Sequence, residues 1–244
     1  MESSTTDRRA VDARSIAEAF RITAEQRADE VAIRTKGDEL SWTWADLRAR
    51  ADALSAGLAG LGLQKGDTVA LLFINRPEFH LCDIAAMQIG GVPFSIYMQY
   101  TAEQIEFVVS DADARILFTE QAFLPQVLEA RKKLPHLEHV IVIDGEAPEG
   151  CLSLSDVEKA DSDFDVAGAA AGIEGDDLLT LIYTSGTTGP PKGVQLCHRN
   201  LLSAVENIEA LVQFPEGARV ISWLPSAHIA ERAAHHYLPI VFGF

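Results

Sequence analysis

Short, mainly apolar runs recur along this chain at intervals that predict strands and helices in turn. The four clearest runs lie at 69–74, 92–96, 115–119 and 139–143. Helical patterns fill the intervals between them, at 78–89, from 101 onward and at 123–134. Strands that alternate with helices favour parallel pairing, and apolar strands suit a sheet that is covered on both faces. The predicted fold class is therefore α/β, with doubly wound parallel sheet layers and flanking helices.

The N-terminal part predicts a different local arrangement. Residues 14–26 carry a helical pattern, and the short runs 31–35 and 40–43 flank a Lys-Gly-Asp turn, as in a β-hairpin. From residue 44 to residue 61, apolar side chains recur every three or four positions, which predicts an amphipathic helix.

Composition divides the chain into three parts. We assign residues 1–165 to a first α/β subdomain and residues 166–177, which are rich in Ala, Gly and Asp without a visible period, to a surface linker. Residues 178–244 predict the start of a second α/β subdomain, which is incomplete. Within this third part, the pattern predicts strands at 178–183, 194–197 and 219–224. It predicts one helix at 199–212.

The segment Tyr183–Gly193, YTSGTTGPPKG, is the strongest candidate for a binding site. Its glycines let backbone N–H groups converge on an anion, and its Ser and Thr hydroxyls and one ammonium group add hydrogen-bond donors. The candidate phosphate ligands are Thr184, Ser185, Gly186, Thr187, Thr188, Gly189 and Lys192. A surface turn of the same composition is the alternative interpretation.

The order of residues around Lys192 argues against the common nucleotide-binding motif. That motif needs Gly directly before the Lys and Ser or Thr directly after it, at the start of a helix. Here Lys192 follows Pro191 and precedes Gly193. A P-loop kinase or GTPase therefore does not fit.

The net charge of −16 argues against nucleic-acid binding, because phosphate backbones are held by clustered Lys and Arg. A bound polyphosphate must instead be neutralised locally, by loop N–H groups, one lysine and Mg²⁺. The three cysteines form no C-x-x-C pair, which favours reduced, structural thiols. Neither a signal peptide nor an apolar run of about 18 residues is visible, so we expect a cytoplasmic protein without a transmembrane segment.

The loop at 183–193 resembles the signature loop of the adenylate-forming enzymes, the superfamily of acyl-CoA synthetases, luciferases and peptide-synthetase adenylation domains. The element LPSAHIAER at 224–232 looks most like that of the long-chain fatty acyl-CoA synthetases. The resemblance extends over nearly the whole chain. Four further segments match the N-terminal part of the superfamily fold in the same order, at 41–47, 66–71, 75–79 and 198–201.

By this resemblance, His228 and Glu231 border the acyl and adenylate pocket, with Arg232 nearby. A cap or packing role at the helix start is the alternative for His228. His228, Glu231 and His235 also share the spacing of one helix face, but no fourth ligand is evident, and we expect no metal site built from protein side chains.

The resemblance implies a long-chain fatty acid–CoA ligase of the AMP-forming type, with ATP, Mg²⁺ and CoA as substrates or cofactor. In that reaction the carboxylate attacks the α-phosphate of ATP, pyrophosphate leaves, and the CoA thiol attacks the acyl-adenylate. Fatty acid and ATP are the implied ligands, and peripheral contact with a membrane stays open. Another acyl-adenylating ligase is the alternative, because this part of the chain does not fix the acyl chain length.

The later motifs of the superfamily do not occur in this chain. A Tyr-Gly-x-Thr-Glu element and a C-terminal catalytic lysine are both missing after residue 228. We therefore expect a truncated N-terminal portion of the fold, without a complete catalytic set and with little or no activity alone. Two explanations stay open: a second polypeptide supplies the missing motifs, or the chain is a non-catalytic remnant that binds nucleotide or acyl chain weakly.

Overall fold

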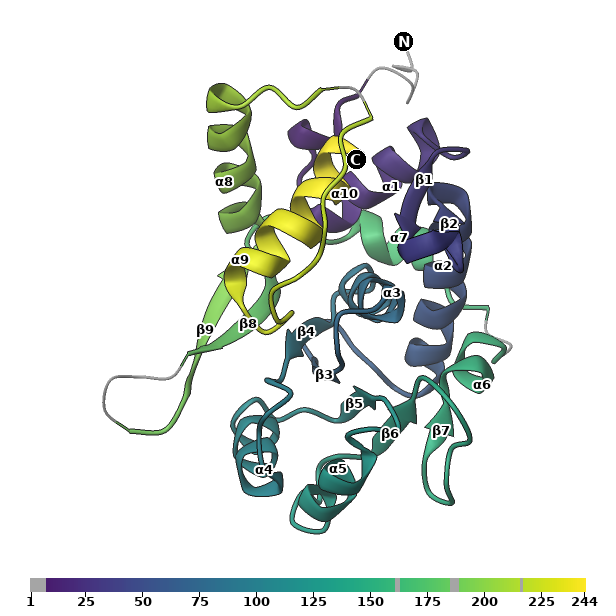
Figure 1. Ribbon diagram of the computed structural model, residues 1–244, viewed down its shortest axis with the longest axis vertical. Helices are drawn as coiled ribbons and strands as arrows, with labels where there is room; N and C mark the ends of the chain where they lie inside the picture. Colours follow the sequence, from purple (N-terminus) through teal and green to yellow (C-terminus); the bar gives the residue numbers. More distant parts are fainter. Residues whose placement is uncertain (1–7, 161–162, 185–188, 216) are drawn as a thin grey trace.

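The computed structural model describes residues 8–160, 163–184, 189–215 and 217–244. At their centre lies a seven-stranded sheet in the order β7-β6-β5-β3-β4-β8-β9 (Figure 1). Neighbouring strands from β7 to β8 pair in parallel, whereas β9 runs antiparallel to β8. The predicted α/β class with a mainly parallel sheet is confirmed. The strands are β3 (Thr68–Leu72), β4 (Val92–Ser95), β5 (Ile116–Thr119), β6 (His139–Val142), β7 (Leu152–Ser153), β8 (Leu178–Thr184) and β9 (Lys192–Cys197).

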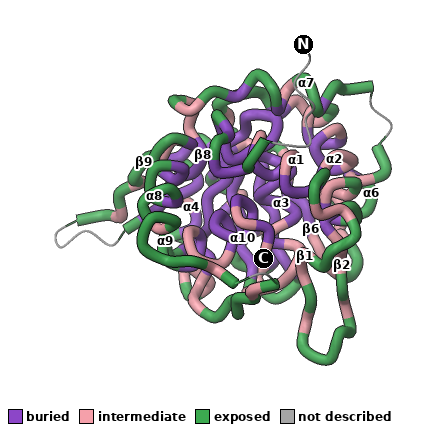
Figure 2. Tube along the Cα trace, turned by 90° about the horizontal axis from the view of Figure 1, so that it is seen from above, coloured by how far each residue is buried: buried purple, intermediate pink, exposed green. Residues whose placement is uncertain are grey.

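Helices cover both faces of this sheet. Val69 and Leu71 of β3 belong to one hydrophobic core, and Ala70 and Leu72 belong to the other, because successive side chains of a strand point to opposite faces. The first core packs against α1 (Ile16–Gln26), α2 (Trp44–Gly60) and α3 (Pro77–Met87). The second packs against α4 (Ala102–Asp111) and α5 (Leu124–Arg131). Figure 2 shows the resulting buried interior, with the β9 edge exposed.

The N-terminal hairpin is confirmed as a separate small sheet. β1 (Val31–Arg34) and β2 (Ser41–Thr43) pair antiparallel, and η3 (Lys36–Asp38) forms the turn between them. The helix α2 starts directly after β2, where Thr43 and Asp46 bond reciprocally as a capping box.

The predicted surface linker at 166–177 contains a helix, α7 (Val166–Ala171), that the absence of a period did not reveal. The side chain of Asp165 accepts from the N–H of Gly168 at 2.9 Å and so caps the helix start. Small Ala side chains then let α7 pack closely against α1 and α2, and its inner face is buried. The sequence did not indicate this helix, and the role of 166–177 as a linker stays a prediction.

The sheet continues past this segment. The strand β8 lies next to β4, with Phe94 opposite Leu181, so residues on both sides of 166–177 share one sheet. The division into two subdomains stays a prediction. The remaining helical elements before the C-terminal stretch are η2 (Ala10–Asp12), α6 (Leu154–Glu158) and α8 (His198–Leu211).

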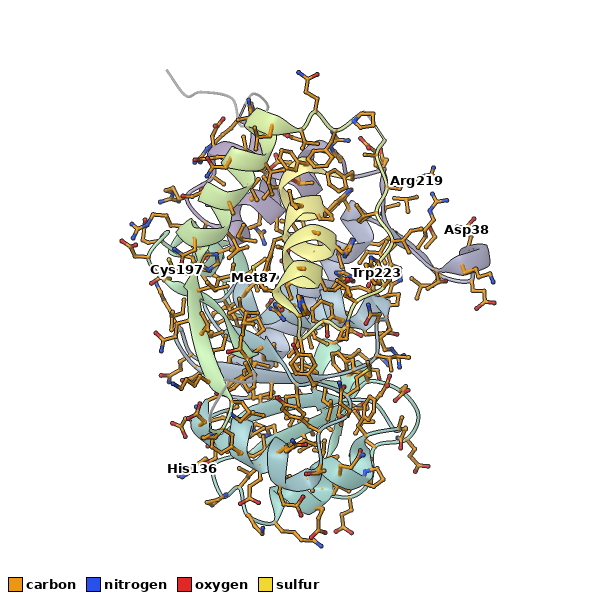
Figure 3. All side chains as sticks on the ribbon, turned by 60° about the vertical axis from the view of Figure 1, so that its left-hand side comes forward. Asp38, Met87, His136, Cys197, Arg219 and Trp223 are labelled. Carbon is orange, nitrogen blue, oxygen red and sulfur yellow. The ribbon has the colours of Figure 1, made fainter. Side chains whose placement is uncertain are left out.

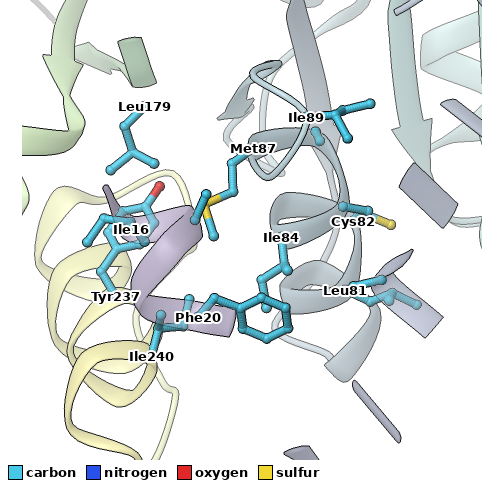
Figure 4. Packing of buried hydrophobic residues seen from close by; sticks show 14 of the residues in the cluster. Ile16, Phe20, Leu81, Cys82, Ile84, Met87, Ile89, Leu179, Tyr237 and Ile240 are labelled. Atoms are coloured by element: carbon cyan, nitrogen blue, oxygen red, sulfur yellow. The ribbon is translucent and has the colours of Figure 1, made fainter. Parts of the chain in front are cut away.

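The C-terminal stretch is helical and packs on the first helix of the chain. It comprises α9 (Ile229–Arg232), the π-helical turn η4 (Ala233–Tyr237) and α10 (Leu238–Phe242). Figure 4 shows its buried side chains beside those of α1, and the hydroxyl of Thr23 in α1 donates to the carbonyl of Ile240 at 2.7 Å. None of the helices in the described ranges is long and apolar enough to cross a bilayer.

Gly57 lies where α2 packs closely against α6. A Cβ at this position would lie 2.1 Å from the carbonyl oxygen of Val157, which is backbone and cannot rotate away. We expect Gly57→Ala to lower the free energy of unfolding by about 2 kcal/mol or more, because overpacking displaces the backbone. Urea denaturation measures this loss.

The matched control for this clash is Gly60→Ala in the last turn of α2. A Cβ on Gly60 meets no atom within 4 Å. The Ala variant should therefore gain up to about 1 kcal/mol of stability from helix propensity. Equal effects of the two substitutions would contradict the close packing of α2 on α6.

His198 joins the start of α8 to the start of α1. Its ring is fully buried, and its Nδ1 accepts from the N–H of Ile16 at 3.1 Å. Burial lowers the pKa of His198 to about 4, so the ring is neutral in the folded protein near pH 7. A protonated ring could not accept this bond.

This lowered pKa predicts a loss of stability in acid. An unfolded histidine has a pKa of about 6.5, so between about pH 6.5 and 4 the unfolded state binds the extra proton and stability falls as the pH is lowered. His198→Gln keeps an acceptor without a titrating ring, and we expect it to remove up to about 1.4 kcal/mol per pH unit of this dependence. Urea denaturation at several pH values, with exposed His136→Gln as control, measures it. Identical pH profiles for wild type and His198→Gln would contradict the assignment.

Candidate active site

The phosphate-loop candidate closes the hairpin between β8 and β9. Thr184 and Lys192 are opposite each other in the antiparallel ladder, so the loop begins and ends at paired residues. Of the predicted ligands, Ser185, Gly186, Thr187 and Thr188 lie outside the described residues. Gly189 has a φ of +105°, a conformation that an L side chain rarely adopts.

The described part of this loop offers an unpaired ammonium group and an open backbone. Thr184 and Lys192 are exposed, and the Lys192 ammonium forms no ion pair with any carboxylate in the described ranges. A Cβ on Gly189 would meet nothing within 4 Å, so the backbone there is open to approach. In a chain of charge −16, an unpaired lysine beside an open glycine backbone fits an anionic ligand.

The base of the hairpin is held by Tyr183. Its hydroxyl donates to Asp111 Oδ2 at 2.8 Å, and its ring packs against Phe94. A Cβ on Gly193 would lie 3.1 Å from the Tyr183 ring, so glycine is needed for β9 to pass this close. Burial, followed by the bond to Asp111, raises the pKa of Tyr183, which keeps the hydroxyl protonated as a donor.

The predicted strand at 219–224 is wrong. These residues form no ladder, and most of their side chains are exposed, with Ile221 at 80% and Trp223 at 70%. A strand needs a neighbour to bond its backbone, and no described strand lies beside this segment. Figure 3 shows Arg219 and Trp223 on an extended stretch that runs beside the C-terminal helix.

Side chains hold the end of this extended stretch. Asn75, three residues after β3, donates from Nδ2 to the carbonyl of Leu224 at 2.6 Å and to Ser222 Oγ at 2.7 Å. Glu231 is buried and accepts from the N–H of Leu224 at 3.0 Å. The Leu-Pro element is thus fixed between the carboxyl end of β3 and the start of α9.

His228 and Glu231, the predicted pocket residues, differ in exposure. His228 is exposed, and its Nδ1 accepts from the N–H of Ala230 at 3.1 Å, so it caps α9. Glu231 Oε2 accepts from His235 Nδ1 at 2.7 Å, while its buried Oε1 has no partner in the described residues. The ring of His228 does not join this pair. Within the described ranges, no group of three His, Cys, Asp or Glu side chains is arranged to hold a metal ion.

Arg232 forms a buried ion pair that the sequence did not indicate. Its guanidinium is completely buried and donates to Asp83 of α3, to Ser95 Oγ at 2.9 Å and to the hydroxyl oxygen of Tyr237 at 2.8 Å. Burial alone would raise the pKa of Asp83, but the attraction of Arg232 and the hydrogen bond from His236 outweigh burial and hold this pKa below its usual range. An Asp in the middle of an apolar helix was the available signal.

A cavity of about 1040 Å³ lies between α3 and the C-terminal helical stretch, with His80 and His236 in its wall. It is lined by β1, by the start of α3, by the extended stretch 217–222 and by the C-terminal helical stretch. His228, Glu231 and the phosphate loop are not among its lining residues, whereas His80, His235 and His236 are. These three histidines were not selected from the sequence as ligand-facing residues.

The profile of the family described as AMP-binding enzyme matches residues 20–244, which is nearly the whole chain. This chain belongs to the AMP-binding enzyme family. The resemblance inferred from the phosphate loop and the Leu-Pro element is therefore confirmed.

Individual members of the AMP-binding enzyme family match different lengths of the chain. It is 34% identical over 208 residues to a long-chain-fatty-acid–CoA ligase of Mycobacterium bovis, covering 83% of this chain and 35% of that ligase. An uncharacterized protein of Mycobacterium tuberculosis is 38% identical over 134 residues, covering 55% of this chain and 75% of that protein. The chain thus spans about a third of the ligase, namely its N-terminal part.

A solved structure supports the fold assignment for this family member. The anthranilate CoA ligase in complex with anthranoyl-AMP superposes with a TM-score of 0.73 at 27% identity, covering 82% of this chain and 38% of that one. The sheet order and helix layers described above are therefore those of an adenylate-forming enzyme.

Proposed function

We propose that this chain supplies the phosphate-binding part of an AMP-forming long-chain fatty acid–CoA ligase. The observation that carries the proposal is the hairpin loop between Thr184 and Lys192, with its open glycine backbone and unpaired ammonium group. The similarity of 34% to a long-chain-fatty-acid–CoA ligase supports the substrate class.

In this proposal, the loop binds the pyrophosphate end of ATP. Backbone N–H groups and hydroxyls of residues 184–189 donate to β- and γ-phosphate oxygens, and Lys192 adds a positive charge. Bound Mg²⁺ supplies the remaining counter-charge. Holding the leaving group in place lowers the cost of aligning it with the attacking carboxylate.

His228 and Glu231 serve the acyl and adenylate end in this proposal. Glu231 fixes the Leu-Pro element through the N–H of Leu224, and the exposed His228 ring begins α9 beside it. The carboxylate oxygen of the fatty acid bonds to the α-phosphorus as pyrophosphate leaves. The CoA sulfur then bonds to the acyl carbon as AMP leaves, and the thiol proton is released.

The chain alone should bind ATP yet form little acyl-CoA, because the motifs for adenine, ribose and the catalytic lysine are not among its residues. Calorimetry with ATP and Mg²⁺ tests binding, and pyrophosphate exchange with ATP and palmitate tests adenylation. Exchange is expected only after addition of a polypeptide that carries the missing motifs.

A comparison of three carboxylic acids distinguishes a long-chain fatty acid–CoA ligase from another acyl-adenylating ligase. Palmitate, octanoate and anthranilate are compared in the exchange reaction, and a preference for palmitate supports the long-chain assignment. A preference for another acid would indicate a different acyl-adenylating ligase. Absence of both ATP binding and exchange would contradict the proposal and favour a non-catalytic protein.

A further inference from the structure

Three side chains form a hydrogen-bonded chain that leads from the core to the wall of the 1040 Å³ cavity. Asp83 Oδ1 lies 2.8 Å from His236 Nε2, and His236 Nδ1 lies 2.9 Å from His80 Nδ1. Asp83 is 0% exposed and His236 is 2% exposed, whereas His80 is only partly buried. His80 is the least buried of the three side chains and lies in the wall of the cavity.

Hydrogen bonding dictates which nitrogen carries each proton when both rings are neutral. The Asp83 carboxylate can only accept, so His236 carries its proton on Nε2. Its bare Nδ1 must then accept from Nδ1–H of His80. His80 is left with an unprotonated Nε2, because its Nδ1 carries the proton in the bond to His236.

The surroundings favour a neutral His80 ring. Arg232 already neutralises Asp83, and His235 adjoins the pair from the same helical stretch. Burial, followed by the proximity of His236, lowers the pKa of His80 to about 3. The ring therefore holds its lone pair near pH 7.

Pro239 explains why His236 is presented in this way. Proline has no N–H and its ring clashes with the carbonyl four residues earlier, here that of His235. The helix responds with a π-turn, in which the N–H of Leu238 bonds to the carbonyl of Ala233, five residues back. Such turns shift the following side chains around the helix and frequently occur at functional sites.

We propose that His80, oriented by His236 and Asp83, is a hydrogen-bond-accepting binding site in this cavity for a small molecule with a hydroxyl or thiol group. The site uses none of the residues assigned above to the nucleotide. Apolar side chains, including Trp44, Ile84 and Ile240, line the rest of the cavity and suit an apolar body on that ligand.

The ligand keeps its proton in this site. Its O–H or S–H donates a hydrogen bond to His80 Nε2, while the Nδ1 proton of His80 stays in the bond to His236 Nδ1. No bond to hydrogen is broken, so the three side chains orient the ligand without ionising it.

Long-range ¹⁵N NMR of histidine-labelled protein tests the proton positions. Histidine in water prefers a proton on Nε2, so a His80 ring protonated only on Nδ1 is the diagnostic result. A His80 ring protonated on Nε2, or a His236 ring protonated on Nδ1, would overturn the proposed hydrogen-bonded chain. Simple packing of two rings does not require the Nδ1 form.

Benzyl alcohol, with ethylbenzene as its hydrocarbon counterpart, tests the ligand class. We expect the alcohol to bind roughly three- to tenfold more tightly, as one added hydrogen bond provides, and to shift His80 Nε2. His80→Phe should abolish this preference, and the exposed His136→Phe should keep it. Equal affinity of the two probes, or no binding of benzyl alcohol up to its solubility, contradicts the proposed site.

Discussion

Replacing Asp83 by Ala is expected to lower the free energy of unfolding by about 3–5 kcal/mol, because the Arg232 guanidinium would stay buried without a counter-charge. Both side chains are 0% exposed, so water cannot compensate the lost partner. Ser95 and Tyr237 still bond to the guanidinium, but neither carries a negative charge. Urea denaturation with an extrapolation to water measures the loss.

An exposed ion pair provides the control for this prediction. Glu106 and Lys133 lie 3.1 Å apart with side chains that are 30% and 64% exposed. Glu106→Ala should cost less than about 1 kcal/mol. A loss for Asp83→Ala that is no larger than this would show that the buried pair does not hold the C-terminal helix to α3.

A double variant separates the cost of the orphaned charge from the value of the pair. Asp83→Leu combined with Arg232→Met removes both charges and fills similar volume. Since the desolvation of two ions offsets much of their attraction, the double variant should regain most of the stability that either single variant loses. Additive losses would argue that the pair itself is strongly stabilising.

Replacing Lys192 by Ala is expected to weaken binding of ATP with Mg²⁺ by about 10- to 100-fold, as the loss of one charge-assisted bond to phosphate predicts. Lys192 is exposed at the end of the hairpin loop, so the fold should not suffer. Calorimetric titration measures the affinity, and the melting temperature should stay within about 2 °C of the wild type.

Two variants control for general effects of charge. Lys159→Ala removes an exposed lysine in a different part of the chain and should leave ATP affinity within about twofold. Lys192→Arg keeps the charge and should restore part of the affinity. Equal weakening by Lys159→Ala and Lys192→Ala would argue for the overall field of the protein rather than for a local phosphate site.

Local patterns were sufficient for most of the fold. The strand at 69–72 is apolar along its whole length because both of its faces are covered, and the capping boxes at Thr43 and Thr101 depend on residues only three positions apart. The predicted strand at 219–224 failed for the opposite reason. Its apolar side chains satisfy the pattern, but a strand also needs a neighbouring backbone, and no local signal reports one.

The candidate site shows the same division. The Gly and Thr order of the phosphate loop and the Leu-Pro element determined the family from sequence alone, because backbone approach and donor groups there depend on residue type. In the structure, β8 and β9 flank the loop, and His228 of the Leu-Pro element caps α9. Whether His228 contacts an acyl chain stays a prediction.

Only the tertiary structure decided which buried polar groups meet. Asp83 and His80 lie about 150 residues from Arg232 and His236 in the chain, and nothing near them in sequence indicates these partners. Packing of α3 against the C-terminal helical stretch brings them together, and Pro239 sets the turn that presents His236. The sequence by itself determined the family and the mainly parallel sheet and located the candidate phosphate loop, since these depend on local residue order. The buried ion pair, and the position of His80 and His236 in the cavity wall, depend on contacts between elements that are distant in the sequence. Only the folded chain specifies these contacts.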